Sequence, residues 1–110
     1  MARLVGGWRI VEMDLWDRDA IDLLGPAVIE FRADGTGSFR FIAVEGFLDF
    51  RHDERATGAR VEFTWEGDDE GSPVSGRGWA ELQPDGSLCG RIFFHLGDDS
   101  GFRAIADTSH

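Results

Sequence analysis

Apolar and polar side chains alternate along most of this chain, in short segments separated by turns that are rich in glycine and aspartate. The clearest segment is Val61–Glu66, in which every second side chain is apolar. A period of two places one set of side chains in a core and the other set in water, as β-strands do. Seven or eight such segments lie between Val5 and Ala106, and they predict an all-β fold.

The connections between these segments are short, and consecutive strands joined by short connections usually pair. Eight strands that pair in order can close on themselves, which removes exposed strand edges. We therefore predict a single-domain antiparallel up-and-down barrel of about eight strands over residues 1–110, with a two-sheet sandwich as the alternative. One short helix or turn is expected between the first two strands, within Trp16–Pro26, capped by Asp17 or Asp19 and ended by Gly25-Pro26.

Turn residues divide the rest of the chain. Glycine accepts a positive φ and proline presets a negative one, so both are typical of tight turns. We predict turns at Asp34–Gly37, Glu45-Gly46, Pro84–Ser87 and Gly97–Gly101, and the longest loop at Gly67–Gly76.

The chain is acidic, with 21 Asp and Glu against 11 basic residues and a formal net charge of −10. Phosphate groups are bound by Lys and Arg, so this balance disfavours nucleic acid and anionic membranes as partners. It permits a cationic ligand or a basic protein. The single cysteine, Cys89, cannot form an internal disulfide, and no apolar run approaches the ~18 residues of a membrane span. We expect a cytoplasmic protein without a cofactor.

Gly6-x-Trp8 opens the first predicted strand and resembles the opening signature of the lipocalin and calycin barrels. The resemblance implies that Trp8 closes the floor of the barrel and packs against an arginine near the end of the last strand. The chain departs from that pattern, because Arg103 lies at the start of the last strand. Arg91 is the possible substitute.

A second resemblance covers nearly the whole chain. The runs Gly25–Phe31, Ser38–Gly46, Phe63–Gly67, Gly76–Ala80 and Gly90–Asp98 resemble a family of short uncharacterised bacterial proteins. This resemblance implies no activity and no site residues.

Alternate connections of an up-and-down barrel lie at the same end. The connections that follow the first, third, fifth and seventh strands should therefore share one end, which is rich in acids. These acids are Asp14, Asp17, Asp19, Asp22, Glu45, Glu66, Asp68, Asp69, Glu70, Asp98 and Asp99.

Three tryptophans and one histidine are expected near that acidic end. Aromatic faces beside carboxylates suit a sugar or an organic cation, and the mouth of a barrel is a usual place for a small ligand. The predicted function is therefore a small-ligand-binding barrel with an acidic, tryptophan-containing mouth and an unknown ligand. The candidate ligand-binding residues are Trp16, Trp65, Trp79, His95, Asp19, Glu45, Asp98 and Asp99.

Two other functions remain open. Thirteen aromatic residues can fill the barrel, and apolar residues on both faces of the first and seventh strands suggest a covered outer surface. Both features favour an acidic protein-interaction module with a solid core, for which a homodimer is one possible form. His95 with Asp98 or Asp99 instead suits acid–base catalysis in a small hydrolase or isomerase. No zinc or calcium motif occurs, so we expect no metal.

Overall fold

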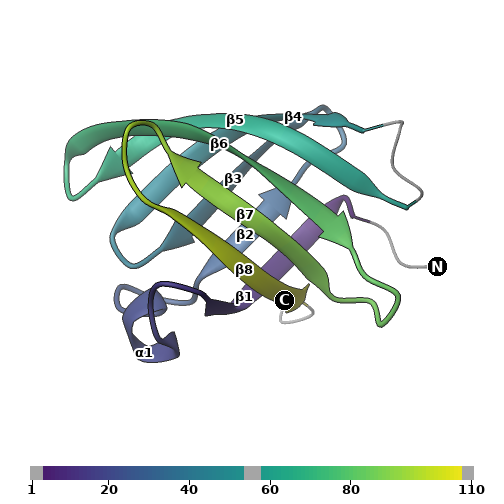
Figure 1. Cartoon of the computed structure of the whole chain (residues 1–110), viewed down its shortest axis with the longest axis horizontal. Coiled ribbons are helices and arrows are strands. Elements are labelled where there is room, and N and C mark those ends of the chain that lie inside the picture. Colours follow the sequence, from purple (N-terminus) through teal and green to yellow (C-terminus); the bar gives the residue numbers. More distant parts are fainter. Residues whose placement is uncertain (1–3, 54–57, 108–110) are drawn as a thin grey trace.

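The computed structural model describes residues 4–53 and 58–107 and confirms the predicted barrel (Figure 1). Eight antiparallel strands pair in chain order, and β8 returns to pair with β1, so the sheet is closed. The elements are β1 (Gly6–Met13), α1 (Arg18–Ile21), β2 (Val28–Phe31), β3 (Thr36–Phe41), β4 (Val44–His52), β5 (Arg60–Asp69), β6 (Ser72–Leu82), β7 (Leu88–Phe94) and β8 (Asp99–Ala106).

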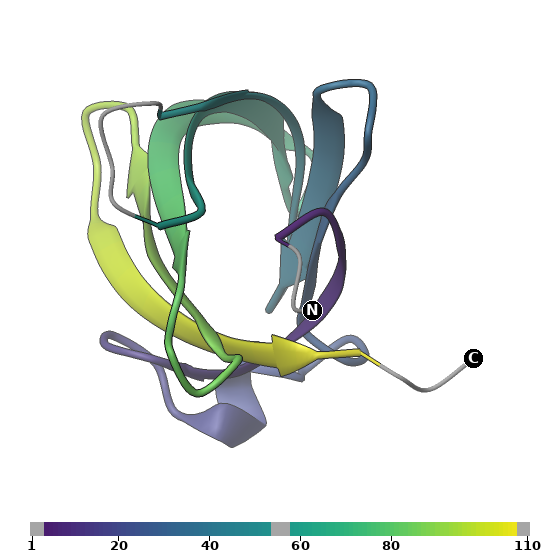
Figure 2. The ribbon, with the colours of Figure 1, turned by 90° about the vertical axis from the view of Figure 1, so that its right-hand side faces the viewer.

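Viewed end-on, the strands form a ring around a central space (Figure 2), and side chains fill that space. Large aromatic residues on the inner face lie opposite glycines on the neighbouring strand. Phe39 pairs with Gly46, Phe63 with Gly78, and Phe102 with Gly90. A Cβ added at any of these glycines would lie 2.4–2.6 Å from the ring of its partner. The missing side chains therefore make room for the rings, and the core is solid.

The start of β1 lies at the end of the barrel that faces the viewer in Figure 2. Trp8 Nε1 donates a hydrogen bond to the carbonyl oxygen of Leu4 at 2.8 Å, and both residues are only 3% exposed. Arg91 and Arg103, the two arginines considered as partners for Trp8, alternate with buried neighbours and face outward. Trp8 is thus held by a backbone carbonyl and the apolar core.

The predicted turn at Glu45-Gly46 is wrong. The hairpin between β3 and β4 turns at Ile42-Ala43, because Phe41 and Val44 are still paired across the strands. Ile42 adopts a positive φ of 54°, which β-branched residues rarely do. Gly46 lies within β4, where it accommodates the ring of Phe39.

The predicted loop at Gly67–Gly76 is also wrong, because β5 and β6 continue through it. Glu70-Gly71 forms the turn, with φ values of 52° and 88° that are typical of a type I′ hairpin. Gly67 and Gly76 are strand residues at close backbone approaches. A Cβ added at Gly67 would lie 1.8 Å from the carbonyl oxygen of Glu45. A Cβ added at Gly76 would lie 1.7 Å from the carbonyl oxygen of Phe93.

The turns at the opposite end agree with the prediction. Asp34 and Asp85 each accept hydrogen bonds from the backbone N–H and hydroxyl of the residue two positions later, Thr36 or Ser87. Gly35 and Gly86 take the positive φ between them. Asp17 caps α1 as predicted, while β8 begins at Asp99 rather than Phe102.

Arginines cover two aromatic residues on the outer wall, Trp79 and Phe93. The Arg60 guanidinium lies 4.3 Å from the centroid of the Trp79 ring, and that of Arg77 lies 5.2 Å from Phe93. The register shift in β1 between Ile10 and Glu12 explains the mixed pattern of that strand. Phe47 and Ile105 remain exposed on the outer wall, at 63% and 43%.

Candidate functional site

Four connections that are distant in sequence meet at one end of the barrel, at the left of Figure 1. There they surround a pocket of about 380 Å³, which we call the mouth pocket. It is lined by Trp16, Phe41, Ile42, Val44, Asp69, Val74, Phe94, His95, Gly97 and Asp98. Three of these connections supply lining residues directly, and the fourth, between β5 and β6, is flanked by the lining residues Asp69 and Val74.

A hydrogen-bond network on β8 fixes the chain just before Trp16. The buried hydroxyl of Ser100 accepts a hydrogen bond from the backbone N–H of Asp14 at 3.1 Å. The Asp14 carboxylate in turn accepts from Arg91 at 3.1 Å, and Arg91 also donates to Asp99. These contacts tie the start of the connection between β1 and β2 to the barrel wall.

The other end of this connection is fixed as well. The backbone N–H of Ile42 donates to the carbonyl of Ile21 at 2.8 Å, and Ile21 is fully buried. Asp22 accepts from the N–H of Ala27 and from Arg9, each at 2.9 Å. The Ala27 hydrogen bond, with a smaller contribution from Arg9, lowers the pKa of Asp22 below its ordinary value. Trp16 is thus held between two anchored ends.

Aromatic rings form the floor of the mouth pocket. The centroid of the Trp16 ring lies 5.5 Å from that of Phe41, and Phe41 lies 6.3 Å from Phe94 in an edge-to-face contact. Phe94 continues downward to Trp65 at 5.1 Å. The floor is therefore the top layer of the solid core.

The predicted site residues separate into three groups. Trp16, His95 and Asp98 line the mouth pocket. Asp19 is exposed on α1, and Asp99 is engaged by Arg91 outside the pocket.

The remaining three predicted residues lie elsewhere. Trp65 is 3% exposed inside the barrel, where its indole N–H donates to the carbonyl of Phe93 at 3.2 Å. Trp79 is on the outer wall beneath Arg60 and away from the mouth, because β6 begins five residues earlier than predicted. Glu45 borders a neighbouring hollow with Arg40.

Sequence reasoning missed the apolar half of the pocket. Phe41, Val44, Val74 and Phe94 have the inward alternation of ordinary core residues, so their pattern alone does not show that they border an opening. These residues border the opening because they lie near the ends of their strands. The sequence could show this only if the positions of the turns were already known.

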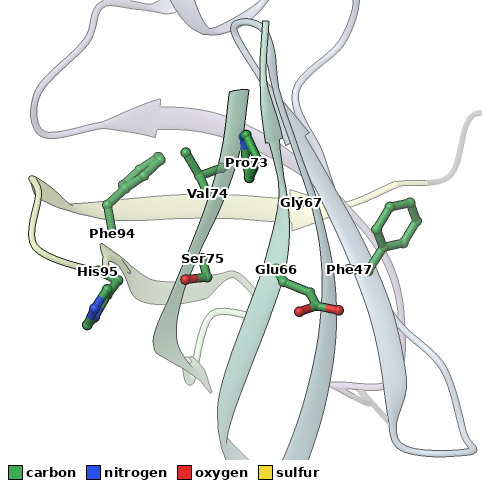
Figure 3. A pocket seen from close by; sticks show the side chains of 8 residues that line it. All are labelled: Phe47, Glu66, Gly67, Pro73, Val74, Ser75, Phe94 and His95. Carbon is green, nitrogen blue, oxygen red and sulfur yellow. The ribbon is translucent and has the colours of Figure 1, made fainter. Parts of the chain in front are cut away.

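A second and larger hollow, of about 560 Å³, lies on the outer wall. Figure 3 shows Phe47, Glu66, Ser75 and His95 spread across neighbouring strands, with Phe94 turned away from His95. Phe47 is 63% exposed. The outer hollow offers a single exposed ring among dispersed polar groups, whereas the mouth pocket has a continuous apolar floor.

Catalytic and metal chemistry find limited support in this arrangement. His95 and Asp98 border the same pocket, but no hydrogen bond joins their side chains in the described part of the chain. Across residues 4–53 and 58–107, no group of three or more His, Cys, Asp or Glu side chains is placed to hold a metal ion. None of the helical segments described is long and apolar enough to span a membrane.

Comparisons of the chain with protein-family models, with curated proteins and with solved structures found no match.

Proposed function

We propose that this protein is a small-ligand-binding barrel that takes its ligand at the mouth pocket. The glycine–aromatic pairs leave the interior filled, so the ligand sits above the core rather than within it. The volume of about 380 Å³ lies within the ~300–1,000 Å³ of small-molecule sites. The single observation that carries the proposal is the combination of a floor built from Trp16, Phe41 and Phe94 with the carboxylates of Asp69 and Asp98 at its edge.

Backbone strain at the same end supports the proposal. Ile42, Glu70 and Leu96 are the non-glycine residues with a positive φ in the described chain, at 54°, 52° and 56°. All three lie in the turns that surround the mouth pocket. Such strained residues cost about 1–3 kcal/mol each and tend to cluster at functional sites.

A protein-interaction module is the second candidate, because exposed leucines surround the same end. Leu15, Leu23 and Leu24 are 50–65% exposed on the connection between β1 and β2, and Leu96 is 95% exposed in the turn after β7. Leucines beside carboxylates suit a basic protein segment with an apolar face. Leu24 borders the hollow beside Glu45 and Leu96 borders a different one, so no single pocket gathers these leucines and we rank this function second.

Tryptophan fluorescence tests the first proposal. A fragment library containing amines, sugars, acids and neutral aromatics is titrated into the wild type, the Trp16→Phe variant and the matched Trp79→Phe variant. We expect at least one fragment to change the emission of the wild type and Trp79→Phe, and to leave that of Trp16→Phe unchanged. A signal that survives in Trp16→Phe and disappears in Trp79→Phe would place binding on the outer wall and refute the proposal.

A further inference from the structure

We infer that the ligand of the mouth pocket is an organic cation, namely a primary amine on an apolar body. This inference rests on the proposed function and adds the chemical class of the ligand. It begins from the way the acids at this end are used.

Five of the eleven acids predicted at this end have partners within the described chain. Asp14 and Asp99 bind Arg91, and Asp22 binds Arg9. Asp17 caps α1, and Asp68 accepts from the N–H of Gly71 at 3.3 Å. These carboxylates stabilise the turns and the connection, so they need no ligand.

Asp69 and Asp98 differ from them. Both line the mouth pocket, and neither carboxylate has a hydrogen bond or ion pair within the described ranges. They come from different parts of the barrel, Asp69 from the end of β5 and Asp98 from the turn before β8. No arginine is among the described residues that line the pocket. Two carboxylates, one half-buried and one exposed, therefore stand at the edge of an apolar floor, where a cation gains charge attraction and ring contact together.

The apolar part of the ligand packs on the aromatic floor of the mouth pocket. Phe41 and Phe94 are packed edge to face, and Trp16 leans over Phe41 at an interplanar angle of 34°. Aromatic faces attract ammonium groups and also bury hydrocarbon. A primary ammonium carries three N–H groups, which carboxylates accept and ring faces attract.

The same floor argues against a sugar. The lining side chains that can hydrogen-bond are Asp69, Asp98, His95 and the indole N–H of Trp16, whereas the floor itself is formed by Phe41, Ile42, Val44, Val74 and Phe94. A sugar hydroxyl group that lies on this floor loses its water without gaining a partner, at about 1–3 kcal/mol. An anion would be repelled by both carboxylates.

Three probes of nearly equal shape test the class of ligand: phenethylamine, phenethyl alcohol and phenylacetate. Binding is followed by the NMR signal of the Trp16 indole N–H in the full chain. We expect phenethylamine to bind at least tenfold more tightly than the alcohol, and phenylacetate not to bind. Tenfold in affinity is about 1.4 kcal/mol, which two partly exposed ion pairs supply at about 0.7 kcal/mol each.

Variants then assign the charge to the two carboxylates. Asp69→Asn and Asp98→Asn should each weaken phenethylamine binding three- to tenfold and leave the alcohol unaffected. Asp19→Asn is the matched control, because Asp19 is exposed at the same end but outside the pocket. Thermal melts check that all three variants are folded.

The outcomes separate this inference from the proposed function. If all three probes bind alike, or an anion or sugar from the fragment library binds Trp16 in preference, the amine class is wrong and the mouth pocket stands. If Asp19→Asn weakens binding as much as the pocket variants do, the two carboxylates are not the site. If no probe and no fragment shifts the Trp16 signal, both proposals fail.

Discussion

An alanine at Gly78 should destabilise the barrel strongly, because its methyl group has no room. The added Cβ would lie 2.4 Å from Cζ of Phe63 and 2.5 Å from the carbonyl oxygen of Arg91, whereas carbon atoms pack at about 3.5–4.0 Å. Either the ring or strand β7 must move by about 1 Å. The Phe63 ring also packs against Phe31, with centroids 6.2 Å apart, so it cannot move freely.

The expected loss is about 2–3 kcal/mol, at the upper end of the usual cost of overpacking. For a domain of this size, that loss lowers the melting temperature by roughly 10 °C. Gly7→Ala is the matched control. Gly7 also lies in a strand, but its added Cβ would meet nothing closer than 3.9 Å. Gly7→Ala should be neutral or stabilising by up to about 1 kcal/mol, because alanine restricts the unfolded chain.

Chemical denaturation with circular dichroism measures both changes. The double variant Phe63→Leu/Gly78→Ala should be more stable than the sum of the two single changes predicts, because the smaller side chain leaves room for the methyl group. A cost below about 0.5 kcal/mol for Gly78→Ala, or strict additivity in the double variant, would refute the view that inner glycines house the rings.

Two further changes test the mouth end. Asp22→Asn should cost about 1 kcal/mol at neutral pH, because the carboxylate accepts from Ala27 and Arg9. The pKa of Asp22 is lowered in the folded protein, so this stabilisation is present above about pH 5 and is lost as the pH falls below about 4. A stability difference between Asp22→Asn and the wild type that persisted in melts at acid pH would contradict this reasoning. Leu96→Gly should stabilise the barrel by about 1 kcal/mol, because the 95% exposed side chain packs on nothing and glycine relieves the positive φ of 56°. A fall in melting temperature for Leu96→Gly would show that the turn is not strained.

The sequence predicted the architecture because alternation is local and easily seen. Val61–Glu66 is regular, and Asp34-Gly35 has the chemistry of a tight turn, so both were interpreted correctly. Gly46 was misread as a turn residue because glycine marks both turns and close packing. Only the ring of Phe39, which is seven residues away, distinguishes the two cases.

The candidate site was harder to predict, since it depends on where the strands end. Trp16 lies shortly after β1, which ends at Met13, and it lines the mouth pocket as the order of the strands predicted. Trp79 was misplaced because β6 extends through residues that resemble a loop. Phe41 and Phe94 were missed because a floor residue has the same alternation as a buried one.

Chemical-shift mapping of a bound fragment on isotope-labelled protein is the most direct test of the mouth pocket. The account predicts that the largest changes fall on the Trp16 indole and on the amides of Asp69 and Asp98, which are remote in sequence and share one pocket. Changes clustered instead around Phe47 and Glu66 would place the ligand on the outer wall and contradict the account.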